Sequence, residues 1–239
     1  ELAAGLAQII TNDLDLSGYF SPMDKGAFLE SGASGEDSVN FKNWSVIGAE
    51  LLIKASYNCV GQSIEVDLKL YDVYWGRQIL GKRVLGETRR HRDLMHRLSN
   101  DIIRLLTGSD GITLTRLAFV GDGTRNKEVY LSDYDGHSAD QLTADKSIVL
   151  SPRWSPDGEW IVFGRRVLAA GKWTPGRQLW RMRVDGSQAE ALTGESFINH
   201  GAPVWSPVGD RLAYLRYNVE APLEPAELWW YDLALRQGS

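Results

Sequence analysis

Two short motifs come near to catalytic patterns, and both fail on their context. Residues 136–140 (GHSAD) approach the Gly-x-Ser-x-Gly nucleophile elbow, but the last glycine is missing and no helix is expected after them. Residues 121–123 (GDG) follow a predicted strand, but Asn126 stands where a dinucleotide-binding motif needs its third glycine. We interpret both stretches as turns, and we predict no catalytic residue, no cofactor and no enzyme activity.

The histidines and carboxylates do not suggest a metal site. His91 and His96 are five residues apart in a predicted helix, so they point about 140° away from each other. A zinc-protease helix needs histidines four residues apart with a glutamate between them. Asp13 and Asp15 lie at a predicted helix end, where we expect them to be solvated. Cys59 is the only cysteine, which excludes an internal disulfide. Its neighbours Tyr57 and Val60 favour a small buried side chain rather than a nucleophile.

Composition narrows the class of partner. The 239 residues are 43% hydrophobic, enough for one large or two modest cores, and the formal net charge is −5. Nucleic-acid-binding domains are usually basic, so no nucleic-acid partner is expected. A basic cluster is the one local exception, and we interpret it as a solvated helix face rather than a patch for an anionic partner. Its members are Lys82, Arg83, Arg89, Arg90, Arg92 and Arg97.

No signal peptide is recognisable at the start of the sequence. No apolar run approaches the roughly 18–20 residues of a spanning helix, so no transmembrane segment is expected. The chain opens at Glu1 rather than at a methionine, and we therefore expect a processed or trimmed start.

Hydrophobic spacing predicts an α+β domain in residues 1–110. Apolar residues recur at helical spacing in 2–17 and 90–107, and they alternate as in a half-buried strand in 64–71. Strands at 49–58 and 78–85 complete an antiparallel meander. A short strand at Tyr19-Phe20 and a loop at 29–40 are also expected.

Residues 111–239 contain a sequence repeat. Residues 151–158 (SPRWSPDG) are matched by 202–209 (APVWSPVG), so that Trp154 and Trp205 are 51 residues apart. Each motif precedes a short apolar strand. A further strand, an Asp-Gly turn and a Leu-Thr outer strand then recur at equivalent positions of the repeats. Four short strands per period of this length are typical of β-propeller blades, with the tryptophan on the innermost strand. A β-sandwich with chance turn repeats is the alternative.

About two and a half such repeats are present. A propeller needs at least four blades to close its ring, and an open ring leaves edge strands and aromatic faces uncovered. We therefore expect further blades after Ser239 in the parent protein.

The chain resembles the TolB family. Residues 13–20 (DLDLSGYF), 44–50 (WSVIGAE), 66–73 (VDLKLYDV) and 106–108 (LTG) are similar to the TolB amino-terminal domain in order and spacing. The Pro-x-Trp-Ser-Pro hairpins resemble the TolB-type propeller repeat. Two features depart from that pattern: Val208 replaces an aspartate, and residues 164–177 are longer than a simple blade loop.

The resemblance implies a non-enzymatic periplasmic protein with a six-bladed propeller. Such a protein binds the Pal-type peptidoglycan-associated lipoprotein of the Tol–Pal system and contributes to outer-membrane integrity, protein transport and constriction at cell division. It also communicates with a TolA-type inner-membrane protein through an amino-terminal segment. This chain starts at the first helix, so we expect that segment to be absent from it.

The resemblance also implies which residues contact the lipoprotein. The family uses loops that lead from an outer strand to the next inner strand, which are 144–150 and 194–202 in this sequence. The candidate residues are Ile148, Leu150, Asn199, His200 and Ala202. For His200, capping of the strand entry is the alternative role.

The repeat alone is also compatible with a second function. The same propeller type accompanies serine peptidases of the prolyl-oligopeptidase type, as a non-catalytic domain before the hydrolase domain. The amino-terminal domain favours the TolB resemblance.

Overall fold

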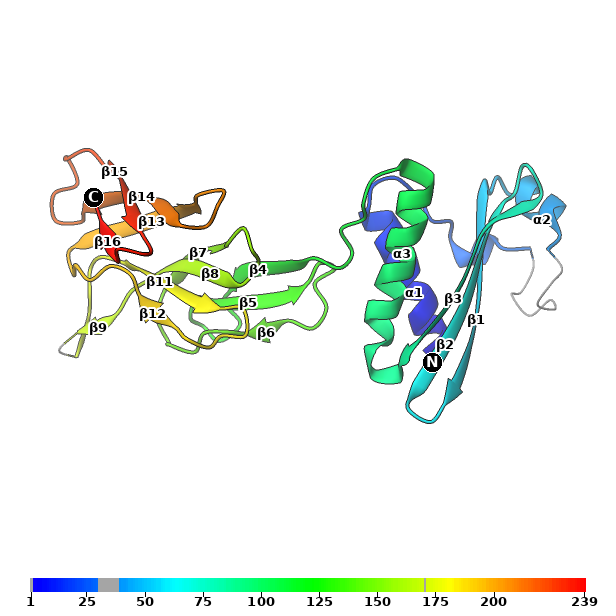
Figure 1. The fold of residues 1–239 in the computed structure, drawn as a ribbon, viewed down its shortest axis with the longest axis horizontal. Helices are drawn as coiled ribbons and strands as arrows, with labels where there is room; N and C mark the ends of the chain where they lie inside the picture. Colours follow the sequence, from blue (N-terminus) through cyan, green and yellow to red (C-terminus); the bar gives the residue numbers. More distant parts are fainter. Residues whose placement is uncertain (1, 30–38, 170) are drawn as a thin grey trace. The chain divides into compact units, whose positions relative to one another are not determined.

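The structure is a computed structural model that describes residues 2–29, 39–169 and 171–239. The chain divides into two compact units, Glu1–Thr115 and Arg116–Ser239 (Figure 1). Within the described ranges, the helices belong to the first unit and the second unit is built of strands and turns. The predicted order, an α+β part followed by an all-β part, agrees with this arrangement.

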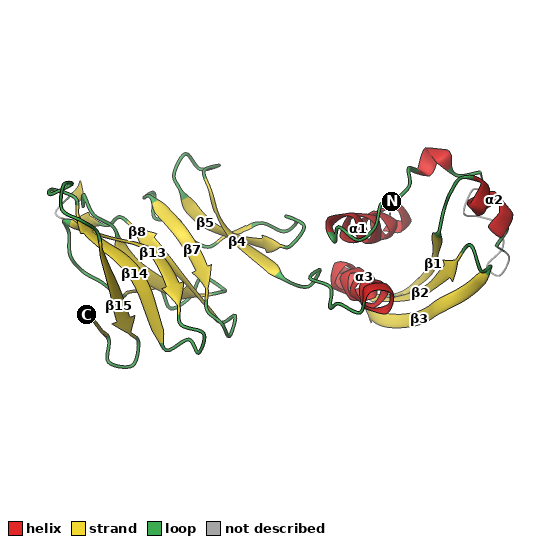
Figure 2. Ribbon diagram, turned by 90° about the horizontal axis from the view of Figure 1, so that it is seen from above, coloured by secondary structure: helices red, strands yellow, loops and turns green. Residues whose placement is uncertain are grey.

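The first unit is a three-stranded antiparallel sheet in the order β1-β2-β3, with α1 and α3 side by side across one face (Figure 2). Its main elements are α1 (Leu2–Leu16), α2 (Phe41–Val46), β1 (Leu51–Val60), β2 (Ser63–Asp72), β3 (Arg77–Glu87) and α3 (His91–Thr107).

Alternation on the central strand creates the core of this unit. Every second side chain of β2, from Ile64 to Leu70, is buried under the helices, and the helices contribute their own apolar stripes. Helix α3 ends at Gly108, whose φ of 74° suits a glycine and whose N–H bonds to the carbonyl of Arg104. The predicted meander and both long helices are therefore present.

Several expectations for this unit need comment. The expected burial of Cys59 is wrong, because this residue of β1 is exposed. The predicted strand at Tyr19-Phe20 is wrong, because Gly18 ends the α1 turn at a φ of 73° and the chain continues without sheet partners among the described residues. Helix α2 was not predicted; its Phe41 and Trp44 pack on the cluster around Tyr71. The predicted loop at 29–40 lies mostly in 30–38, outside the described residues.

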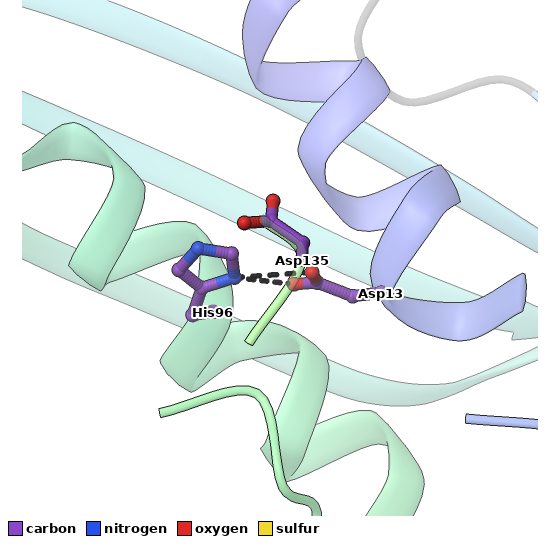
Figure 3. A group of neighbouring side chains, drawn as sticks. All are labelled: Asp13, His96 and Asp135. Atoms are coloured by element: carbon purple, nitrogen blue, oxygen red, sulfur yellow. Dashed lines mark hydrogen bonds and ion pairs between the residues drawn. The ribbon is translucent and has the colours of Figure 1, made fainter. Parts of the chain in front are cut away.

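A buried polar pair joins the two long helices of this unit. Nδ1 of His96 on α3 lies 2.9 Å from a carboxylate oxygen of Asp13 on α1, and both residues are at least 97% buried (Figure 3). The expectation that Asp13 is solvated is wrong. Because a buried carboxylate needs a donor, the imidazole N–H compensates for the water that Asp13 has lost.

The second unit contains three antiparallel sheets in succession and one small hairpin. The sheets have the orders β4-β5-β6, β7-β8-β11-β12 and β13-β14-β15-β16. Their strands are β4 (Arg116–Gly121), β5 (Glu128–Asp133), β6 (Asp140–Gln141), β7 (Val149–Trp154), β8 (Trp160–Arg165), β11 (Gln178–Arg183), β12 (Glu190–Ala191), β13 (Ile198–Trp205), β14 (Arg211–Asn218), β15 (Glu227–Asp232) and β16 (Gln237–Gly238). The long connection at 164–177 holds the hairpin of β9 (Leu168–Ala169) and β10 (Lys172–Trp173).

Successive sheets lie face to face (Figure 2). Each buries apolar side chains against the next. Val162 and Leu179 of the second sheet share a cluster with Leu212 and Tyr214 of the third. Trp154 and Trp205 end the equivalent strands β7 and β13, and each lies in the cluster between its sheet and the preceding one. The indole Nε1 of Trp205 also donates to the carbonyl of Arg153 at 3.2 Å.

The turn after each of these tryptophans is closed by a serine and a carboxylate. In the first copy the Ser155 hydroxyl donates to Asp157 at 2.5 Å, and Gly158 has a φ of 72°. Val208 replaces that aspartate in the second copy, but the Ser206 hydroxyl donates to Asp210 at 2.6 Å instead. A carboxylate two residues later therefore compensates for the departure from the family pattern.

Within the described ranges, none of the helices combines the length and the apolar character needed to cross a bilayer.

The core of the first unit gives a stability prediction. Leu68→Ala removes a fully buried side chain from the sheet face under the helices, so we expect it to lower the free energy of unfolding by about 2–5 kcal/mol. Leu85→Ala is the matched control, because Leu85 on β3 is 71% exposed. Urea unfolding followed by circular dichroism measures both, and equal losses for the two variants would contradict this core.

Candidate partner-binding site

The candidate residues lie on two segments that lead into the inner strands of the second and third sheets. We call residues 144–150 the first segment and residues 194–202 the second segment. Both were expected to be loops throughout, which is wrong at their ends, because β7 begins at Val149 and β13 at Ile198. Each of these strands contains a β-bulge, and it pairs with the next strand on both sides of the bulge. The bulge lies between Leu150 and Arg153 in β7 and between Gly201 and Val204 in β13.

The two segments occupy equivalent places in their repeats. Val149 pairs with Arg165 and His200 pairs with Arg216, so Val149 and His200 correspond. In each bulge a residue other than glycine takes a left-handed backbone, Ser151 at a φ of 55° and Ala202 at 49°. The structure therefore brings the candidate residues to matching positions on neighbouring sheets.

Exposure separates the candidates. Ile148 is 38% exposed and Ala202 is also exposed, so both are accessible from solvent. Leu150 is half-buried, whereas Asn199 and His200 are only 3% and 1% exposed. In this structure the two buried side chains support the second segment from within, and their contact with a partner remains a prediction.

Sequence reasoning missed an exposed aromatic residue in the second segment. Phe197 is 49% exposed, and its carbonyl accepts a hydrogen bond from the N–H of Val219 at 3.0 Å. A phenylalanine within a segment already chosen for partner contact was the available signal, since aromatic residues are enriched in protein interfaces.

His200 is surrounded by hydrogen-bond acceptors. Its Nδ1 lies 3.1 Å from the carbonyl oxygen of Arg177, and its Nε2 lies 3.2 Å from a carboxylate oxygen of Glu195. A neutral imidazole has one N–H, so it can donate to only one of these acceptors at a time. Burial lowers the pKa of His200, against the opposing effects of the Arg177 carbonyl and the Glu195 charge.

Backbone contacts fix the start of the second segment. The N–H of Gly176 donates to the carbonyl of Ser196 at 2.9 Å, and the N–H of His200 donates to that of Arg177 at 2.8 Å. A Cβ atom on Gly176 would lie 2.2 Å from the carbonyl oxygen of Ile198, so only glycine fits this close approach.

The serine motif at 136–140 and the basic cluster, which the sequence does not identify as functional sites, have structural roles. His137 and Ser138 lie in the turn between β5 and β6, where the N–H of Asp133 donates to the His137 carbonyl at 2.9 Å. In the basic cluster, salt bridges of 2.5–2.9 Å join four members to carboxylates of the same unit. These pairs are Lys82–Asp101, Arg83–Asp67, Arg89–Glu87 and Arg90–Asp93.

These features define a class of protein in which an α+β unit precedes repeated antiparallel sheets, with accessible segments at the entry to the inner strands. Residues 1–79 match the family model of the TolB amino-terminal domain. The Tol-Pal system protein TolB of Syntrophotalea carbinolica is 37% identical over 164 residues, which are 67% of this chain and 38% of that protein. The Tol-Pal system protein TolB of Anaeromyxobacter dehalogenans is 32% identical over 214 residues, covering 89% of this chain and 48% of that protein.

A solved structure agrees with the fold over nearly the whole chain. The crystal structure of TolB from Acinetobacter baumannii superposes with a TM-score of 0.80 at 23% identity, covering 98% of this chain and 56% of that one. The chain is similar to TolB proteins over two thirds or more of its length, and the resemblance predicted from the sequence is confirmed. It spans about half or less of the length of the curated relatives described above.

Gly176 gives a prediction about the support of the second segment. Gly176→Ala forces a Cβ atom against the backbone at Ile198, so we expect it to destabilise the second unit by about 1–3 kcal/mol. Gly194→Ala is the control, because a Cβ there meets open space at an ordinary φ. Urea unfolding followed by tryptophan fluorescence compares them, and a Gly176→Ala variant as stable as Gly194→Ala would show that the approach is not tight.

His200 gives a prediction about pH. Its pKa is lowered in the folded state, so the unfolded chain takes up the proton more readily once the pH falls below about 6.5. We therefore expect wild type to lose more unfolding free energy than His200→Gln when the pH falls from about 7.5 to about 5.5. Urea unfolding at both pH values measures this difference. His137→Gln, at an exposed turn histidine, is expected to behave like wild type, and equal pH dependence of all three proteins would refute the prediction.

Proposed function

We propose that this chain is part of a non-enzymatic periplasmic protein-binding scaffold of the Tol–Pal system. Its partner is the Pal-type peptidoglycan-associated lipoprotein, and its role is to maintain the outer membrane and support its constriction at cell division. Similarity to TolB proteins supports this assignment to the Tol–Pal system, since the relatives are named as Tol-Pal system proteins.

The observation that carries the binding proposal is the placement of the accessible candidates. Ile148 and Ala202 are exposed on equivalent segments of neighbouring sheets, and Phe197 adds an exposed aromatic side chain to the second of them. Two adjacent segments that combine apolar side chains with a fixed backbone suit a protein partner, because little order is lost on binding.

We also propose that the repeated sheets are blades of a β-propeller. The face of the second sheet that carries Val162 and Leu179 is covered by the third sheet. The corresponding face of the third sheet carries Leu215, Leu228 and Trp230, which are 41%, 77% and 42% exposed. Such a face suits the next sheet of a radial stack.

The binding proposal predicts the effect of placing charge on the segments. Ile148→Arg and Ala202→Arg put a guanidinium into the expected contact surface, and we expect each to weaken binding of the lipoprotein at least about tenfold. Ala202→Arg adds no new backbone strain, because alanine already takes the left-handed conformation there. Isothermal titration of the whole chain with a Pal-type lipoprotein lacking its lipid anchor measures the affinity.

Val208→Arg is the control for this experiment. Val208 is 82% exposed in the turn after Trp205 and lies outside both segments, so its variant should bind as wild type does. Absence of binding by the wild-type chain would overturn the proposed function, and undiminished binding by both arginine variants would overturn the proposed surface.

A further inference from the structure

Each segment carries a carboxylate that pairs with an arginine on the second strand of its sheet. Asp145 of the first segment lies 2.7 Å from Nη2 of Arg165 on β8. Glu195 of the second segment lies 2.9 Å from Nη2 of Arg216 on β14. Arg165 and Arg216 are equivalent in the repeat, because they pair with Gln178 and Glu227 at the start of the third strand.

Each of these arginines also stacks on a tryptophan of the third strand. The guanidinium carbon of Arg165 lies 4.3 Å from the ring centre of Trp180, and that of Arg216 lies 4.6 Å from the ring centre of Trp229. We call Asp145, Arg165 and Trp180 the first clamp, and Glu195, Arg216 and Trp229 the second clamp. Both arginine side chains are about four-fifths buried, at 21% and 22% exposure.

The clamps lie where the segments enter their sheets. In the first segment, Ile148 follows Asp145 by three residues. The second clamp holds its segment at two residues, because Glu195 belongs to the segment and also contacts Nε2 of His200. A flat guanidinium held between a carboxylate and an indole has a fixed plane, so it orients the carboxylate that it binds. The segment that carries this carboxylate is therefore oriented as well.

We propose that Glu195 and Arg216, and in the first repeat Asp145 and Arg165, are positioning residues that hold the two segments in the conformation that binds the partner. This inference rests on the proposed function, since it concerns the same surface. The clamp residues act through the segments, and the contact itself is made by the exposed side chains beyond them.

The electrostatic environments of the two clamp carboxylates differ. Burial raises the pKa of Asp145, with Arg165 acting in the opposite direction, so the carboxylate is kept at a place that disfavours its charge. The hydrogen bond from Arg216 lowers the pKa of Glu195, which remains charged. Partly exposed ion pairs contribute little to global stability, but they restrict the side chains that they join.

The second clamp is the better one to test. Nε1 of Trp229 donates to Glu227 at 2.8 Å, and Arg216 contacts that same carboxylate at 3.2 Å. In the first clamp, Nε of Arg165 and Nε1 of Trp180 are buried without a hydrogen-bond partner among the described residues. The second clamp is thus the more completely bonded of the two.

The test compares two arginines of the same strand. Arg216→Met removes the second clamp, whereas Arg211→Met removes an arginine that also stacks on a tryptophan, Trp230 at 4.8 Å, and also pairs with a carboxylate, Asp232 at 3.4 Å. Arg211 lies at the other end of β14, away from the second segment. Glu195→Gln keeps the size of its side chain and removes its charge.

We expect Arg216→Met and Glu195→Gln each to weaken binding of the lipoprotein about tenfold, and Arg211→Met to change it less than about twofold. Because both variants loosen one segment, the double variant should be little weaker than either single variant. Amide hydrogen exchange of the free chain should accelerate in residues 196–202 for these variants and stay unchanged for Arg211→Met.

Two results would overturn the inference and leave the proposed function standing. One is affinity within twofold of Arg211→Met for both clamp variants, while wild type binds and Ala202→Arg binds at least about tenfold more weakly. The other is weakened binding with unchanged exchange in residues 196–202, which would mean that the clamp residues touch the partner themselves. If wild type fails to bind, the proposed function falls, and this role for the clamps falls with it.

Discussion

The structure of the second unit depends on burying sheet faces against each other. An antiparallel sheet has two faces to cover, and here the second sheet packs one face on the first sheet and the other face on the third. Val162 and Leu179 of one sheet pack on Leu212 and Tyr214 of the next. Because this packing fixes the strands, it also fixes where the connecting segments enter, and those segments carry the candidate binding residues.

The repeated frame allows the chemistry of equivalent positions to differ. The buried position that holds Val149 in one repeat holds His200 in the next, and the surrounding strand pairing is the same. The histidine adds polar contacts to Arg177 and Glu195 where the valine has only apolar ones available. One backbone arrangement thus supports two segments whose buried side chains differ in polarity.

The sequence was sufficient for features that follow from local periodicity. Alternation identified β2, helical spacing identified α1 and α3, and the matched tryptophan turns identified the equivalence of β7 and β13. It was insufficient where tertiary contacts decide. Helix α2 is too short to show a period, and the burial of Asp13 depends on a partner 83 residues away.

At the candidate site too, local sequence patterns predicted some features, and others depended on tertiary contacts. Its segments could be placed by their position in the repeat, but the exposure of their side chains could not, and two of five candidates are almost fully buried. The stacking of Arg165 and Arg216 on tryptophans was also hidden, since each contact joins two strands across a connection of variable length. The physical reason is common to both. Burial and stacking are properties of a face shared by several strands, so they become visible only when the register is known. Once it is known, Arg165 and Arg216 fall on corresponding positions, and a pattern that no single repeat reveals becomes evidence for a shared role.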